Sequence, residues 1–310
     1  MKQVKWHGFE AWQLADDRLQ TLIVPALGAK IASLVDLSGP FEWMAPPTHA
    51  VRKRIYGDSF VEHDLAGWDE MFPTITACPS PFDASVMLPD HGEVWALPWE
   101  VVATDANALT LAVEGRAMAY RLTRTASLSQ GVLRLHYHLA NRSSQAMPFL
   151  WAAHPLFRVE TACELALPAV VQQVVNTAAH PRLGAPDRLL AWPDAQLEDG
   201  STLALNHVGT PETPDYRKVY TRPEQVIGAG RVRQGRHSLT MRWDTATAPY
   251  LGIWVDERTY TAGTTTALEP ASGYYDALDL ALRNERVSVV PPGGETTWWL
   301  SVSFDDRSAL

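Results

Sequence analysis

Three segments of this 310-residue sequence place titratable groups among aromatic side chains, where acid–base chemistry could occur. Residues 57–73 hold five carboxylates outside any clear strand pattern. That composition is typical of a structured loop beside a site, and a solvated acidic loop is the alternative. Residues 89–99 place His91 near two tryptophans, where a structural histidine is the alternative. His154 interrupts an apolar run over 148–157, and because a buried histidine needs a partner, it is either a hydrogen-bonded core residue or a chemical group.

A fourth segment, residues 265–273, contains a carboxylate in apolar company. Glu269 lies between Leu268 and Pro270, and the proline biases it towards an extended backbone. At the end of a strand among apolar neighbours, the pKa of this carboxyl is expected to be raised, which suits a general base. An exposed glutamate at a strand end is the alternative.

Two further histidines raise the question of a metal site. His136 and His138 would share one face of a strand, where two imidazoles can bind one metal ion. The sequence offers no obvious third ligand nearby, so we favour a solvated strand face. It also has no Gly-Lys-Ser/Thr phosphate loop, no Gly-x-Ser-x-Gly elbow and no Rossmann glycine fingerprint. No metal or other cofactor is therefore expected.

The elements that must position these groups are mostly strands. Residues 108–114, 120–128 and 132–139 alternate apolar and polar side chains, with short turns between them, which predicts an antiparallel meander. We therefore expect an all-β protein with two or more antiparallel sheets packed face to face in one domain. The other expected elements are a hairpin over 20–24 and 30–36, strands over 239–243, 250–255 and 296–304, a short helix over 276–282 and long loops over 180–221.

Composition excludes several classes of protein. The 35 acidic and 26 basic side chains give a formal net charge of −9, which argues against binding to a nucleic-acid backbone. No apolar run approaches the roughly 18 residues of a membrane-spanning helix, and the first residues lack the apolar core of a signal peptide. Cys78 and Cys163 lie in neither a metal nor a redox spacing. We expect two buried thiols in a cytoplasmic protein, and one disulfide is the alternative.

Taken together, these segments resemble the aldose 1-epimerases, a group within the galactose mutarotase-like family. The pieces that carry the resemblance occur in the family's order and span nearly the whole chain. They are Gly28-Ala-Lys-Ile-Ala-Ser-Leu34, Gly67-Trp-Asp-Glu-Met-Phe-Pro73, His91-Gly92, His154-Pro-Leu-Phe157, Leu251-Gly-Ile-Trp254, Leu268-Glu-Pro270 and Pro291-Pro-Gly-Gly-Glu295. The best-known branch has a doubled His-x-His-Gly-Gly where this chain has Asp90-His-Gly-Glu93, so the chain resembles a divergent branch.

The resemblance implies a single β-supersandwich domain over residues 1–310 and roles for particular residues. His154 matches the family's general acid, Glu269 matches its general base, and His91 matches a histidine that holds the sugar. Arg54 is the candidate for an arginine that contacts substrate. The other residues expected to bind the sugar are Trp68, Asp69, Glu70, Trp151 and Trp254.

The chemistry implied by the resemblance is mutarotation, in which a sugar ring opens, the C1–C2 bond rotates and the ring closes as the other anomer. A carboxylate can remove the proton of the C1 hydroxyl while an imidazolium delivers one to the ring oxygen. The expected partner is a small-molecule sugar, with no nucleic acid, membrane or obligate protein partner. The alternatives are a carbohydrate-binding or sugar-sensing protein without turnover, and an accessory domain of a glycoside hydrolase or lyase.

Overall fold

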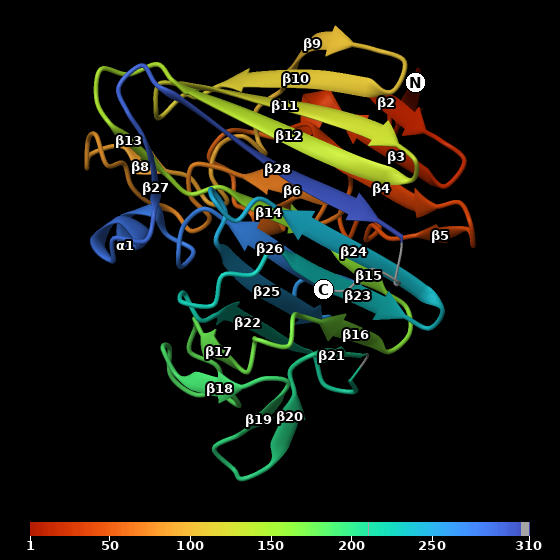
Figure 1. Ribbon diagram of the computed structural model, residues 1–310, viewed down its shortest axis with the longest axis vertical. Coiled ribbons are helices and arrows are strands. Elements are labelled where there is room, and N and C mark those ends of the chain that lie inside the picture. Colours follow the sequence, from red (N-terminus) through yellow and green to blue (C-terminus); the bar gives the residue numbers. More distant parts are fainter. Residues whose placement is uncertain (210, 305–309) are drawn as a thin grey trace.

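The computed structural model describes residues 1–209, 211–304 and 310, and most strands in them belong to two large antiparallel sheets (Figure 1). The larger sheet has thirteen strands. Its main path runs in the order β1 (Lys2–Trp6), β2 (Phe9–Ala15), β3 (Leu19–Val24), β4 (Lys30–Asp36), β6 (Trp68–Met71), β14 (Ala152–Pro155), β26 (Thr264–Ala271), β25 (Tyr250–Glu257), β22 (Asp215–Thr221), β17 (Gln173–Asn176) and β18 (Leu189–Ala191). Beside this path, β5 (Phe41–Glu42) pairs with β4 and β15 (Phe157–Val159) pairs with β26.

The second sheet has nine strands and includes the last strand of the chain. Its order is β21 (His207–Val208), β16 (Cys163–Ala166), β23 (Ala229–Gln234), β24 (His237–Trp243), β28 (Glu295–Ser303), β12 (Val132–Asn141), β11 (Tyr120–Ser129), β10 (Ala108–Glu114) and β9 (Glu100–Thr104). Three two-stranded sheets complete the strands of the described residues: β13 (Met147–Phe149) with β27 (Ser288–Val290), β19 (Asp194–Gln196) with β20 (Thr202–Ala204), and β7 (Cys78–Pro79) with β8 (Met87–Leu88).

Helices are short throughout the described part of the chain. They are the α-helix α1 (Leu278–Arg283) and the 3-10 turns η1 (Pro25–Leu27) and η2 (Phe60–Glu62). None of the described helices has the length and apolar character needed to cross a membrane.

The expected meander is confirmed as β10, β11 and β12. In β11, every second residue from Tyr120 to Leu128 is buried, which is the period of a strand with one face on the core. Antiparallel pairing with β12 sets Leu122 opposite Leu139 and buries both side chains. The hairpin expected over 20–24 and 30–36 is also present, as β3 and β4.

The two large sheets pack against each other in layers, with the core between them (Figure 1). Tyr137 of β12 stacks on Trp298 of β28 at a ring-centroid distance of 5.1 Å and lies 4.9 Å from Trp151, which directly precedes β14. Side chains of both sheets therefore meet in one apolar cluster, and the predicted all-β sandwich of antiparallel sheets is confirmed. A single domain agrees with this shared apolar cluster, and it stays a prediction.

Two of the expected loops are wrong in part. The segment over 57–73 is irregular only as far as residue 67, because residues 68–71 form β6 between β4 and β14. All four β6 side chains are buried, so the strand has no polar–apolar alternation to reveal it. The stretch over 180–221 contains the short strands β18 to β21 and the longer β22. The helix expected over 276–282 is present as α1.

Candidate active site

One face of the larger sheet forms the floor of the candidate site. The antiparallel β14–β26 register sets Ala152 opposite Ala271. His154, two residues after Ala152, and Glu269, two residues before Ala271, therefore project from the same face. On the next strands, Trp254 of β25 and Lys218 of β22 are paired in register beside them. Strand pairing thus gathers on one face side chains that lie far apart in the sequence.

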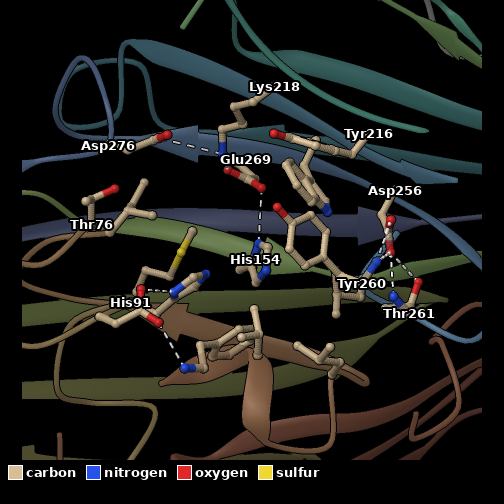
Figure 2. A pocket seen from close by; sticks show the side chains of 18 of the residues that line it. Thr76, His91, His154, Tyr216, Lys218, Asp256, Tyr260, Thr261, Glu269 and Asp276 are labelled. Atoms are coloured by element: carbon tan, nitrogen blue, oxygen red, sulfur yellow. Dashed lines mark hydrogen bonds and ion pairs between the residues drawn. The ribbon is translucent and has the colours of Figure 1, made fainter. Parts of the chain in front are cut away.

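A cavity of about 290 Å³ lies over this floor (Figure 2). Its volume is at the lower end of small-molecule pockets, roughly 300–1,000 Å³, which fits a ligand of about one sugar ring. Four predicted site residues line it, namely His91, His154, Trp254 and Glu269. The lining also includes the unpredicted side chains Tyr216, Lys218, Tyr260 and Asp276.

The two predicted proton carriers are in direct contact. His154 Nδ1 lies 3.1 Å from Glu269 Oε1, and both side chains are buried. Burial lowers the pKa of His154 from its ordinary value of 6.5, although the hydrogen bond to Glu269 acts in the opposite direction. Because the carboxylate is an acceptor, Nδ1 is the donor, and Nε2 makes no hydrogen bond with any described residue. Nε2 is therefore the ring nitrogen left to act on a ligand.

A lysine that the sequence analysis did not single out completes this group. Lys218 Nζ donates to Glu269 Oε2 and lies 3.7 Å from Asp276 Oδ1 (Figure 2). Asp276 Oδ1 also accepts a hydrogen bond from the hydroxyl of Tyr220 at 2.7 Å. Opposite Glu269 stands Gly252, where a β-carbon would lie 3.3 Å from Glu269 Oε2. The missing side chain leaves room for the Lys218–Glu269 contact.

The expected rise in the pKa of Glu269 is wrong. Burial alone would raise the pKa from its ordinary 4.5, but the positive charge of Lys218 and the hydrogen bond from His154 outweigh burial and lower it to about 2. Burial in turn lowers the pKa of Lys218, and the carboxylates of Asp276 and Glu269 outweigh that effect and raise it. The site therefore holds an ionised carboxylate beside an ammonium group.

His91 forms part of the cavity wall. Its ring stacks on Phe60 at a centroid distance of 4.1 Å, lies 5.4 Å from the His154 ring, and has Nδ1 2.8 Å from Asp90 Oδ1. The following residue, Gly92, has a φ of 71°, and a β-carbon there would overlap the carbonyl oxygen of Phe72. A glycine at position 92 is therefore needed to bring the His91 turn against the end of β6.

An aromatic group forms another wall. The rings of Trp254, Tyr216 and Tyr260 lie between 5.3 and 5.7 Å from one another, measured centroid to centroid. Asp256 accepts hydrogen bonds from the backbone N–H groups of residues 259–261 and from the hydroxyl of Thr261. This carboxylate therefore positions the loop that carries Tyr260. Trp254, the one predicted tryptophan in the cavity, offers an apolar ring face to a ligand.

Two predicted substrate-binding residues lie outside the cavity, in a buried charge cluster. Arg54 Nη1 is 2.7 Å from Asp69 Oδ1, and Arg54 Nη2 is 3.0 Å from Asp64 Oδ1. Lys30 lies 2.7 Å from the other oxygen of Asp69 and 3.1 Å from Asp64. Only 5% of Arg54 and 1% of Asp69 is exposed. The cluster ties the loop before β6 to the sheet.

The other three predicted substrate-binding residues, Trp68, Glu70 and Trp151, face the core between the sheets. Glu70 accepts hydrogen bonds from Arg124 and Tyr137 of the nine-stranded sheet and from the indole of Trp151, each at 2.8 Å. Trp68, two residues from Glu70 on β6, is fully buried in the same apolar core. Because side chains alternate along a strand, Asp69 points to the cavity side of β6 while Trp68 and Glu70 point away from it.

The two histidines weighed as a metal pair lie on the outer face of β12. His138 Nε2 is 2.9 Å from the exposed carboxylate of Glu295, and His136 is solvent-exposed. Among the described residues, no group of three or more His, Cys, Asp or Glu side chains is arranged to hold a metal ion.

Comparison with known proteins gives structural relatives only. No protein-family model matches the chain, and no curated protein matches its sequence. The Slr1438 protein from Synechocystis sp. PCC 6803 is similar with a TM-score of 0.71 and 20% identity, over 98% of this chain and 100% of that one. A galactose mutarotase-like protein from Clostridium acetobutylicum gives 0.69 and 13%, over 97% of each chain. A galactose mutarotase related enzyme from Lactobacillus acidophilus gives 0.64 and 15%, over 96% of this chain and 98% of that one.

Two of these three structures carry the galactose mutarotase name, and each aligns with nearly the full chain at low sequence identity. They confirm the resemblance at the level of fold. The protein has the galactose mutarotase-like fold, in a sequence that has diverged widely from its structural relatives.

Proposed function

We propose that the protein is an isomerase of the aldose 1-epimerase type, which interconverts the α and β anomers of a sugar. The observation that carries this proposal is the His154–Glu269 pair on the floor of a sugar-sized cavity, with His154 Nε2 free to face a ligand. The mutarotase-like structural neighbours support a sugar as the ligand. Both cysteines are buried and free, in keeping with a cytoplasmic enzyme.

In this proposal, Glu269 takes the proton of the C1 hydroxyl and His154, as imidazolium, delivers a proton to the ring oxygen. Opening of the ring lets the C1–C2 bond rotate, and the reverse transfers close the ring as the other anomer. Because burial lowers the pKa of His154, its imidazolium form is a strong proton donor. His91 and the aromatic wall of Trp254, Tyr216 and Tyr260 hold the ring.

The five predicted residues outside the cavity act on this site indirectly. Arg54 and Asp69 hold the loop that carries Phe60, the residue stacked on His91. Trp68, Glu70 and Trp151 support the floor from behind through the core between the sheets. We assign these residues a positioning role and no contact with the sugar.

A second candidate is a carbohydrate-binding protein without turnover. The Lys218–Glu269 ion pair favours it, because a carboxyl with a pKa of about 2 is a weak base. The two candidates share the cavity and the ligand class and differ in whether anomer exchange is accelerated.

Polarimetry and exchange NMR of freshly dissolved hexoses and pentoses separate them. The proposal predicts that at least one sugar equilibrates faster in proportion to protein concentration. If every sugar of the panel relaxes at its spontaneous rate, the enzyme proposal is wrong. Calorimetric binding of a sugar in that same panel would then support the non-catalytic candidate.

A further inference from the structure

A second cavity adjoins the candidate active site at Asp276. It has a volume of about 730 Å³ and shares Thr76, Ala178 and Asp276 with the first cavity. Asp276 Oδ1 lies 3.7 Å from Lys218 Nζ, and Lys218 in turn contacts Glu269. The boundary between the two cavities is therefore separated from the proposed base by a single side chain.

The lining of this second cavity offers hydrogen-bond donors and acceptors side by side. Asp187 accepts a hydrogen bond from the hydroxyl of Tyr275, Asn284 brings an amide with both kinds of group, and Arg286 brings a guanidinium. Thr177 adds a hydroxyl. Sugar hydroxyls both donate and accept, so a mixed lining of this kind suits a ligand with many hydroxyl groups.

Charge argues for a neutral ligand. Asp187 and Asp276 contribute two carboxylates, and Arg286 is the one cationic side chain among the described lining residues. The guanidinium of Arg286 also lies 3.8 Å from Glu224 and 5.2 Å from the ring centroid of Tyr274. A sugar phosphate placed here would meet more negative than positive charge, whereas a neutral sugar would meet no such repulsion.

We infer that the second cavity is a subsite for a second sugar unit, and that the substrate is the reducing end of a disaccharide or longer oligosaccharide. The inference rests on the proposed function: the reducing unit occupies the first cavity, with C1 at His154 and Glu269. The next unit crosses Asp276 and lies among Asp187, Asn284 and Arg286. The first cavity alone is small, and the larger second cavity beside it gives the remaining sugar units of the oligosaccharide a place to bind.

The test compares glucose with disaccharides that have glucose at the reducing end: maltose, cellobiose, lactose, isomaltose, gentiobiose and laminaribiose. Anomer exchange by the wild-type protein should give a kcat/KM for at least one disaccharide that exceeds that of glucose about tenfold or more, as expected for one or two added hydrogen bonds. Equal or lower values for every disaccharide would overturn the subsite.

Substitutions in the second cavity test whether its residues cause the higher kcat/KM for the disaccharide. Asn284→Ala and Arg286→Ala should each lower kcat/KM for the preferred disaccharide about fivefold or more and leave that for glucose nearly unchanged. Arg283→Ala is the matched control, because Arg283 is the last residue of α1, directly before Asn284, pairs with Asp279 and does not line the cavity. Equal losses on glucose and the disaccharide, or the same loss in Arg283→Ala, would contradict the inference.

Calorimetry keeps the two proposals apart. If no sugar is turned over, the proposed function fails, and binding of the same disaccharides then decides the subsite by itself. A disaccharide that binds the wild-type protein about tenfold more tightly than glucose, and loses that advantage in Arg286→Ala, supports the subsite. Equal affinity for glucose and all disaccharides rejects it.

Discussion

Glu269 is the residue on which the proposed chemistry depends, and its one carboxylate is shared by His154 and Lys218. The ion pair with Lys218 keeps Glu269 ionised, and the hydrogen bond to His154 orients the imidazole with Nδ1 as donor. The cost of this arrangement is a carboxylate with little affinity for a proton. Lys218 therefore sets how well Glu269 can serve as a base.

The pH dependence of activity follows from these two groups. The proposed mechanism requires Glu269 to be ionised, which holds above a pKa of about 2, and His154 to be protonated, which holds only below its lowered pKa. We expect kcat/KM to fall as the pH rises, with the midpoint below 6.5, the ordinary value for histidine. Exchange rates measured between pH 4 and 9 check this. A rate that is constant up to pH 8 would contradict the assignment of His154 as the acid.

Replacing Lys218 tests its control over the pair. In Lys218→Met, loss of the positive charge should raise the pKa of both Glu269 and His154, because that charge lowers both in the wild-type protein. Both limbs of the pH profile should move to higher pH. Lys53→Met, at an exposed position that does not line the cavity, serves as the control. A pH profile that does not shift in Lys218→Met would show that Lys218 does not control the pKa values of His154 and Glu269.

Sequence reasoning found part of this site. His91, His154 and Glu269 stand out because each interrupts an apolar or glycine-containing motif, and the structure brings all three to one cavity. The sequence analysis misses Lys218 because it expects loops over 180–221, where the structure has β22. It does not single out Asp276, which lies at the start of the helix expected over 276–282. The alternation of Tyr216, Lys218 and Tyr220 on one face of β22 was the available signal.

At the scale of elements, the segment before β6 is held by charge rather than by a strand partner. Arg54 and Lys30 bind both Asp64 and Asp69, so a single buried cluster joins the loop, β4 and β6. The pKa of Asp64 is about 2, because the charges of Lys30 and Arg54 outweigh the effect of burial. The position of Phe60, and with it the packing on His91, depends on this cluster.

Removal of Arg54 should therefore be costly. Arg54→Met leaves two buried carboxylates with one cation, and we expect the free energy of unfolding to fall by about 3–5 kcal/mol. Arg52→Met is the matched control: the Arg52 side chain is exposed and makes one 3.3 Å hydrogen bond to the carbonyl of Glu62, so the loss should stay within about 0.5 kcal/mol. Urea denaturation measures both, and equal losses would argue against the cluster.

Elements were predictable where one face of a strand is exposed. β10 to β12 alternate, and their boundaries in the structure lie within two residues of those expected. The side chains of β6 point alternately to the two faces of the sheet, but all four are buried. Arg54 and Lys30 cover Asp69 on one face, and the other face packs on the core. A strand buried on both faces carries no period-two signal, so the sequence predicts a loop there.

At the scale of the whole molecule, the two sheets are interleaved along the chain. β28, the last strand, pairs with β12 and β24 inside the nine-stranded sheet, while β1 to β4 and β26 belong to the other. Neither sheet can be completed from one half of the sequence. The length of the chain alone would allow two domains, and the continuous strand pattern, together with the resemblance, predicts one.

Unfolding should accordingly be a single event. We expect one cooperative calorimetric transition, with coincident loss of far-ultraviolet circular dichroism and tryptophan fluorescence. Two separable transitions would contradict the single domain. Deletion of β28 is expected to abolish folding altogether rather than to remove one unit, because β12 and β24 would lose the strand between them.

The most direct test of the account is the rate of anomer exchange in Glu269→Gln beside the wild-type protein, followed by polarimetry on the best sugar of the panel. Glu114→Gln, a surface carboxylate paired with Arg121, is the control for the substitution itself. We predict a loss of about 10²-fold or more in Glu269→Gln with the fold intact, and no loss in Glu114→Gln. Wild-type exchange rates in Glu269→Gln would contradict the central claim.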